Sequence, residues 1–109
     1  MIILLALYSF AGVILAGLSV PLILHKIPPN GLYGFRSRST LDNPQLWYRV
    51  NAYAGKRLLV TGLGTSIAAI ILYYTTSNVE EYALSCMGFF LALFLWMMVT
   101  SFLYLRSFH

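Results

Sequence analysis

Apolar runs separated by charged residues form the main pattern of the chain. The runs cover residues 2–24, 58–76 and about 82–105. As helices rising about 1.5 Å per residue they would be about 34, 28 and 36 Å long, which matches a hydrocarbon core about 30 Å thick once some tilt is allowed. The pattern therefore predicts an all-α integral membrane protein with three transmembrane helices, organised as a single membrane domain over residues 1–109.

The second run continues a helix that begins before it. Asn43 is a favourable N-cap residue, Pro44 suits the first helical position, and no further proline follows before residue 76. We predict one helix over residues 44–76. Such a helix is about 48 Å long, so its first turns lie in the membrane interface or in water.

Basic residues are distributed unevenly between the two sides of this layout. They occupy the long connection between the first and second runs and the end of the chain: Lys26, Arg36, Arg38, Arg49, Lys56, Arg57 and Arg106. The opposite side carries the amino terminus, Asn78, Glu80 and Glu81. By the positive-inside rule, the long connection and the C-terminus are cytoplasmic and the N-terminus is outside, which is an N-out/C-in arrangement.

Composition excludes a soluble domain and offers little for catalysis. Charged residues make up 9% of the chain, whereas a soluble domain carries about 25%. The chain has one cysteine, two histidines far apart in sequence, and three carboxylates, of which Asp42 lies on the opposite side of the membrane from Glu80 and Glu81. Acid–base catalysis and metal binding need such groups in clusters. We therefore expect no enzyme activity, no catalytic residue, no metal site and no cofactor.

Small residues spaced three or four apart give each run a face on which another helix can pack. In lipid, where little hydrophobic force draws helices together, such faces let two backbones approach closely. The faces are Ser9, Gly12, Ala16 and Ser19 in the first run, Thr61, Thr65 and Ala69 in the second, and Ser85, Gly88 and Ala92 in the third. We prefer a compact three-helix bundle to a dedicated dimerisation face.

The connection over residues 25–57 has specific turn chemistry. Pro28 and Pro29 end the first helix, and Asn30 and Gly31 can adopt positive φ. Gly34 lets the backbone approach a neighbouring group closely. These residues predict a shaped, basic cytoplasmic loop between the first two helices.

Two interpretations of the basic residues remain open. Arg36 and Arg38 point the same way if their segment is extended, and guanidinium groups near hydroxyls and a helix N-terminus can form a phosphate or carboxylate site. Alternatively, the charges only set topology, and each gains about 1 kcal/mol near an anionic leaflet. On that basis four residues are candidate contacts for anionic lipids: Arg38, Arg49, Lys56 and Arg57.

The spacing of residues in the predicted helix over residues 44–76 defines two of its faces. Trp47, Asn51 and Gly55 recur every four residues and share one face, while Arg49, Tyr53 and Lys56 line another. Asn51 either helps the loop to dock on this helix by bonding turn backbone groups, or is solvated at the interface.

These residues together resemble a known motif. Asn30, Gly34 and Arg36 in the loop, followed by Trp47-x-x-x-Asn51-x-x-x-Gly55, are similar to the motif of the SdpI family of small bacterial membrane proteins, whose founding members are immunity proteins. The three-span layout of that family covers nearly the whole chain. The six residues Asn30, Gly34, Arg36, Trp47, Asn51 and Gly55 are accordingly the candidate binding or loop-shaping motif.

The resemblance implies a multi-pass protein of the bacterial cytoplasmic (inner) membrane that protects its cell from a membrane-active peptide toxin and signals to a cytoplasmic regulator. Residues 28–47 would pack on the start of the second helix and form a cytoplasmic docking surface, with Arg36 as its main charge.

Candidate partners are membrane lipids, the toxin, the regulator, and a homo-oligomer or larger membrane complex, without direct binding to nucleic acid. The alternative function is a lipid-binding or accessory subunit of a larger membrane complex with no toxin role.

Overall fold

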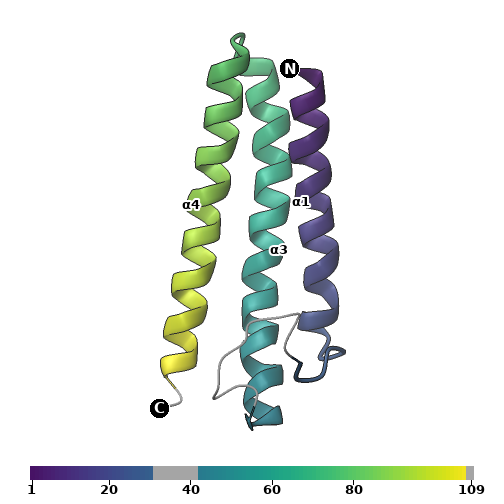
Figure 1. Cartoon of the computed structure of the whole chain (residues 1–109), viewed down its shortest axis with the longest axis vertical. Coiled ribbons are helices and arrows are strands. Elements are labelled where there is room, and N and C mark those ends of the chain that lie inside the picture. Colours follow the sequence, from purple (N-terminus) through teal and green to yellow (C-terminus); the bar gives the residue numbers. More distant parts are fainter. Residues whose placement is uncertain (31–41, 108–109) are drawn as a thin grey trace.

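The computed structural model describes residues 1–30 and 42–107, and this part of the chain is built from helices (Figure 1). They are α1 (Ile2–Ile23), α3 (Pro44–Thr75) and α4 (Val79–Arg106). All three are long and apolar enough to cross a membrane. Large apolar side chains such as Phe10, Ile67 and Phe102 are exposed along them, as expected for surfaces that face lipid. The prediction of an all-helical protein with three candidate spans is confirmed.

Asparagine side chains cap the starts of α3 and α4. The Asn43 side chain accepts a hydrogen bond from the Leu46 amide at 3.2 Å, and Pro44 occupies the first helical position. Asn78 accepts from the amides of Glu80 and Glu81 at 2.8 and 3.3 Å. The two glutamates also lie in the first turn of α4, where negative charge is favourable. With only residues 76–78 between them, α3 and α4 form an antiparallel helical hairpin.

Two backbone hydrogen bonds close the end of α1. The His25 amide donates to the Leu22 carbonyl, and the Lys26 amide donates to the Pro21 carbonyl at 2.9 Å. This is the Schellman arrangement, in which the residue with positive φ is usually glycine. Here that residue is His25, with φ of 60°. A side chain in this conformation costs about 1 kcal/mol or more, so other contacts must hold His25 in place.

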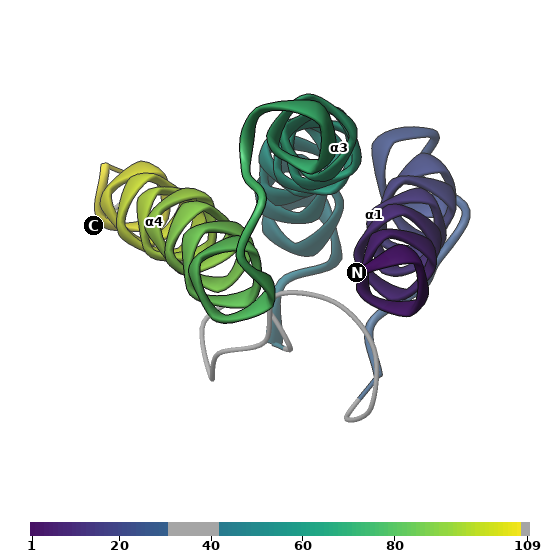
Figure 2. The ribbon, with the colours of Figure 1, turned by 90° about the horizontal axis from the view of Figure 1, so that it is seen from above.

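The helices form a layer in which α3 packs against both α1 and α4, which flank it (Figures 1 and 2). α1 and α4 meet near the N-terminus, where the Tyr8 hydroxyl donates to the Ala83 carbonyl at 3.2 Å. Farther from that end they separate, and an apolar groove of about 390 Å³ opens between them, lined in part by Leu15, Thr65 and Phe90. The expected compact bundle is therefore closed at one end only.

Two of the three predicted small-residue faces lie at helix interfaces. Gly12, Ala16 and Ser19 are buried in α1, and the Ser66 hydroxyl of α3 donates to the Ser9 carbonyl at 2.8 Å. The predicted face of α3 is also buried, at Thr61, Thr65 and Ala69.

The predicted small-residue face of α4 is wrong. Ser85, Gly88 and Ala92 are exposed, and a Cβ added at Gly88 would meet nothing within 4 Å. The residues that α4 buries are Tyr82, Cys86, Met97, Ser101 and Leu105. At the α3–α4 interface the small residue belongs to α3: a Cβ added at Gly64 would lie 2.9 Å from Leu93 Cδ1. A large side chain of α4 therefore packs against a glycine of α3.

Candidate functional site

Trp47 and Asn30 fix the chain that follows α1. Trp47 is fully buried although it lies in the first turn of α3, and its indole Nε1 donates to the Ile27 carbonyl at 2.8 Å. The Asn30 side-chain amide donates to the Pro28 carbonyl at 2.8 Å, which closes a short turn. The indole thus ties the segment after α1 to the start of α3.

Asn51 lies one turn further along α3 and is buried, with an exposed fraction of 1%. Its Nδ2 donates to the Trp47 carbonyl at 3.0 Å. The alternative of an Asn51 solvated at the interface is therefore excluded. A buried amide needs partners for its polar atoms, so its position is fixed more strongly than that of a surface asparagine.

Gly55 lies where the C-terminal end of α1 approaches the N-terminal half of α3. A Cβ at this position would lie 3.0 Å from Ile23 Cγ1, 3.1 Å from Leu22 Cβ and 3.1 Å from the Ser19 carbonyl oxygen. The end of α1 can reach α3 closely because Gly55 has no side chain. Three other predicted site residues, Gly34, Arg36 and Arg38, lie outside the described residues.

Arg57 lies between aromatic rings at the α3–α4 interface. Its guanidinium carbon is 4.7 Å from the centre of the Tyr53 ring and 4.6 Å from that of Trp96. A guanidinium nitrogen also donates to the Tyr53 hydroxyl at 2.8 Å. Arg57, which was expected to contact anionic lipids, thus makes cation–π contacts within the protein.

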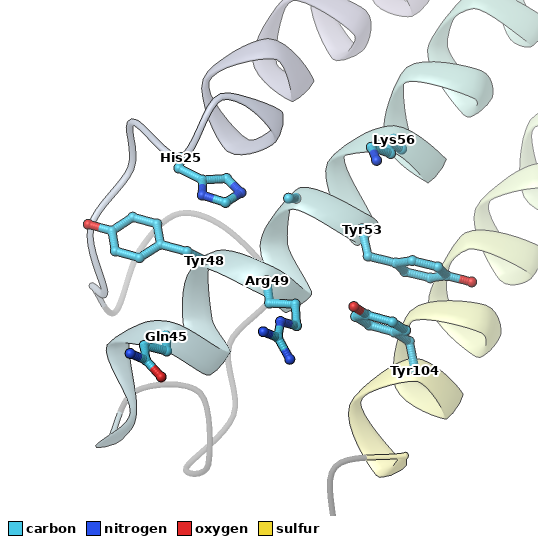
Figure 3. Close-up of a pocket in the computed structure, with 8 residues that line it drawn as sticks. His25, Gln45, Tyr48, Arg49, Tyr53, Lys56 and Tyr104 are labelled. Atoms are coloured by element: carbon cyan, nitrogen blue, oxygen red, sulfur yellow. The ribbon is translucent and has the colours of Figure 1, made fainter.

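Arg49, Tyr53 and Lys56 line one open pocket of about 530 Å³ (Figure 3), as their shared helical face predicts. Gln45 and Tyr48 line it from the same helix, His25 from the end of α1, and Tyr104 from the end of α4. The rings of Tyr53 and Tyr104 stack with centroids 4.1 Å apart, and those of His25 and Tyr48 with centroids 5.7 Å apart. The pocket therefore combines cationic groups with aromatic walls at the end of the layer where α1 and α4 end and α3 begins.

No group of three or more potential metal ligands lies together within residues 1–30 and 42–107. The described lining of the pocket is suited to binding an anion, through positive charge and hydrogen-bond donors.

Comparison with protein-family models identifies a family for this chain. The model of the SdpI/YfhL protein family matches residues 26–104. This chain belongs to the SdpI/YfhL family. The match covers residues 26–43, all of α3, and α4 as far as Tyr104, so the resemblance seen in the sequence is confirmed. No curated protein and no solved structure matches the chain.

Family membership and the three candidate spans make the chain a multi-pass membrane protein of the SdpI/YfhL family. Sequence reasoning placed Arg49, Tyr53 and Lys56 on a common face but did not join them to His25 or Tyr104. His25 lies in the turn after α1 and Tyr104 belongs to α4, and neither has a spacing signal that points to the pocket. The signal that was available for His25 is its place directly after the end of α1, before two prolines.

Proposed function

We propose that this SdpI/YfhL family member is an immunity-type membrane protein that protects a bacterium from a membrane-active peptide toxin. The observation that carries the proposal is the family match over residues 26–104, which includes the motif from Asn30 to Gly55. The protein acts by binding, without enzymatic chemistry. It also signals to a cytoplasmic regulator once the toxin is present.

The proposed orientation is N-out/C-in, in the bacterial cytoplasmic (inner) membrane. Support comes from the placement of charge along the helices. The end of α1, the start of α3 and the end of α4 lie together at one end of the layer (Figure 1), and Lys26, Arg49 and Arg106 belong to these three segments. Glu80 and Glu81 lie in the first turn of α4, at the opposite end. By the positive-inside rule, the basic end faces the cytoplasm.

The proposed contact surface for the toxin or the regulator is the connection between α1 and α3, with Arg36 as its main charge. The residues that border residues 31–41 support the proposal: Trp47 Nε1 donates to the Ile27 carbonyl, and Asn51 is buried one turn further along α3. Ile27 and Trp47, which lie on either side of residues 31–41, are joined by this hydrogen bond and need no further ordering when a partner binds.

Survival of a toxin-sensitive bacterial host tests the proposal. Cells expressing the wild-type protein, Arg36→Ala or Lys26→Ala are challenged with a panel of membrane-active peptide toxins at matched membrane abundance. Wild type and Lys26→Ala should protect, and Arg36→Ala should not. Lys26 is the control because it is exposed, lies in the same connection, and loses the same charge.

The outcomes separate charge from geometry. If Arg36→Lys protects, a positive charge at this position is sufficient; if it fails while accumulating normally, the guanidinium shape is required. Absence of protection by the wild type across the panel would contradict the immunity proposal.

The second candidate function is a lipid-binding or accessory subunit of a larger membrane complex, with no role in toxin defence. The observation that favours it is the pocket containing Arg49 and Lys56, which lies on a different face of α3 from Trp47 and Asn51. Lipid binding there would persist in a protein that gives no protection.

A further inference from the structure

The charge of the pocket at the end of the layer is entirely positive among its described lining residues. Arg49 and Lys56 are exposed and lie two turns apart on α3, a rise of about 10 Å. None of the described lining residues is Asp or Glu. Three tyrosines and Gln45 add hydrogen-bond donors. Guanidinium and ammonium groups beside neutral donors favour a phosphate anion.

His25 is held over this pocket in a costly backbone conformation. Its φ of 60° is one that glycine would adopt without strain. The imidazole stacks on Tyr48 with an interplanar angle of 21° (Figure 3). Strained residues persist where the surroundings fix them, and they concentrate at binding sites. His25 therefore forms a fixed wall of the pocket on the α1 side.

Tyr53 and Tyr104 form the wall on the α4 side. Their rings lie nearly parallel, with an interplanar angle of 6°. Arg57 supports this wall from behind, because its guanidinium lies over the Tyr53 ring and donates to the Tyr53 hydroxyl. Arg57 is thus a positioning residue for the pocket and does not line it.

An apolar surface continues from the pocket along the same face of α3. Lys56 is followed on that face by Val60, Leu63 and Ile67, at spacings of four, three and four residues. These three side chains are 48%, 45% and 56% exposed. A cationic pocket that leads directly onto exposed aliphatic side chains matches a molecule with an anionic head and a hydrocarbon chain.

We propose that this pocket binds the phosphate group of an anionic phospholipid. Arg49 and Lys56 contact the phosphate, the tyrosine hydroxyls donate to the headgroup, and an acyl chain lies along Val60, Leu63 and Ile67. The site rests on the second candidate function, lipid binding, and it lies on a different face of α3 from Trp47 and Asn51. Its test is therefore separate from the test of toxin protection.

Lipid titration of the purified full-length protein tests the site. Native mass spectrometry in mild detergent measures binding of short-chain phosphatidylglycerol and of phosphatidylcholine with the same chains. The pocket variant is Arg49→Gln/Lys56→Gln. The control is Lys26→Gln/Arg106→Gln, which removes two positive charges from exposed positions outside the pocket lining. Size-exclusion profiles establish that each variant is folded.

We expect phosphatidylglycerol to bind the wild type more tightly than phosphatidylcholine, and the pocket variant to weaken phosphatidylglycerol binding by about tenfold or more. The control should stay within about twofold of the wild type. Equal weakening in both variants would show that only overall surface charge matters, and it would overturn the site. So would unchanged binding in the pocket variant.

A competition arm distinguishes the lipid from a soluble phosphate compound. Glycerol 3-phosphate and inorganic phosphate carry the anionic group without a chain, so neither should displace phosphatidylglycerol at a comparable concentration. Displacement at equal concentration would overturn the assignment to a lipid, because the aliphatic face of α3 would then contribute nothing to binding.

Discussion

Where α1 crosses α3, the two backbones lie against each other; where α4 crosses α3, large side chains separate them. At the first crossing, a Cβ at Gly12 would meet Ser66 Oγ and the Gly62 carbonyl, and a Cβ at Gly62 would meet the Gly12 carbonyl and the Ala16 amide. All but one of these groups belong to helix backbones, which cannot move aside.

At the α3–α4 crossing the contacts involve long side chains. Tyr82 is fully buried and its hydroxyl donates to the Ala69 carbonyl at 2.8 Å. Arg57 lies between Tyr53 and Trp96, and Leu93 packs beside Gly64. Helices in lipid associate through close packing and through hydrogen bonds. In this protein close packing dominates at the α1–α3 interface, and side-chain hydrogen bonds dominate at the α3–α4 interface. The α1 interface should therefore tolerate added volume far less well.

The largest expected effect is that of Gly62→Ala at the α1–α3 crossing. The added methyl group meets backbone atoms, so α1 must move away, and we expect the free energy of unfolding to fall by about 2 kcal/mol or more. Unfolding of the purified protein by SDS in mixed micelles, followed by circular dichroism, measures the change. Gly17→Ala is the control, because a Cβ there meets nothing within 4 Å. A loss of equal size in the control would contradict the close-packing argument.

A smaller effect is expected for Tyr82→Phe at the α3–α4 crossing. The variant keeps the ring and removes the hydroxyl, which leaves the Ala69 carbonyl without that donor. The expected loss in the free energy of unfolding is about 0.5 to 1 kcal/mol, the usual range for such a hydrogen bond. The same SDS titration detects it, with Tyr74→Phe as the control because Tyr74 is 80% exposed. If both variants behave like the wild type, the Tyr82 hydrogen bond does not stabilise this crossing.

The smallest effect is expected for Gly64→Ala, on the α4 side of α3. The new methyl group would meet Leu93 Cδ1, which is the end of a flexible side chain and can rotate away. We expect a change below about 0.5 kcal/mol, since the better helix propensity of alanine offsets part of the repacking cost. Gly62→Ala and Gly64→Ala make the same chemical change two residues apart, so the ratio of their effects measures the difference between the two interfaces directly. Equal losses in the two variants would contradict the proposed difference between the α1–α3 and α3–α4 interfaces.

Several features followed from the sequence because they depend on local chemistry. The three spans are set by the length of the apolar runs. The start of α3 is set by Asn43 and Pro44, which supply a cap and a pre-formed φ. The shared face of Arg49, Tyr53 and Lys56 follows from helical spacing alone and accounts for the α3 side of the pocket.

Other features were decided by the tertiary structure. The rotation of α4 turns Ser85, Gly88 and Ala92 outward, and the divergence of α1 and α4 leaves a groove where a closed bundle was expected. Packing also brings His25 and Tyr104 to the pocket from opposite sides of α3. The physical reason is that the parts of these helices that lie within lipid are apolar on nearly every side, because lipid and protein interior are similar surroundings for a side chain. The length of an apolar run then determines where a helix lies in the membrane, whereas its hydrophobic periodicity gives little information on which side faces its neighbours. The contacts between particular side chains decide that.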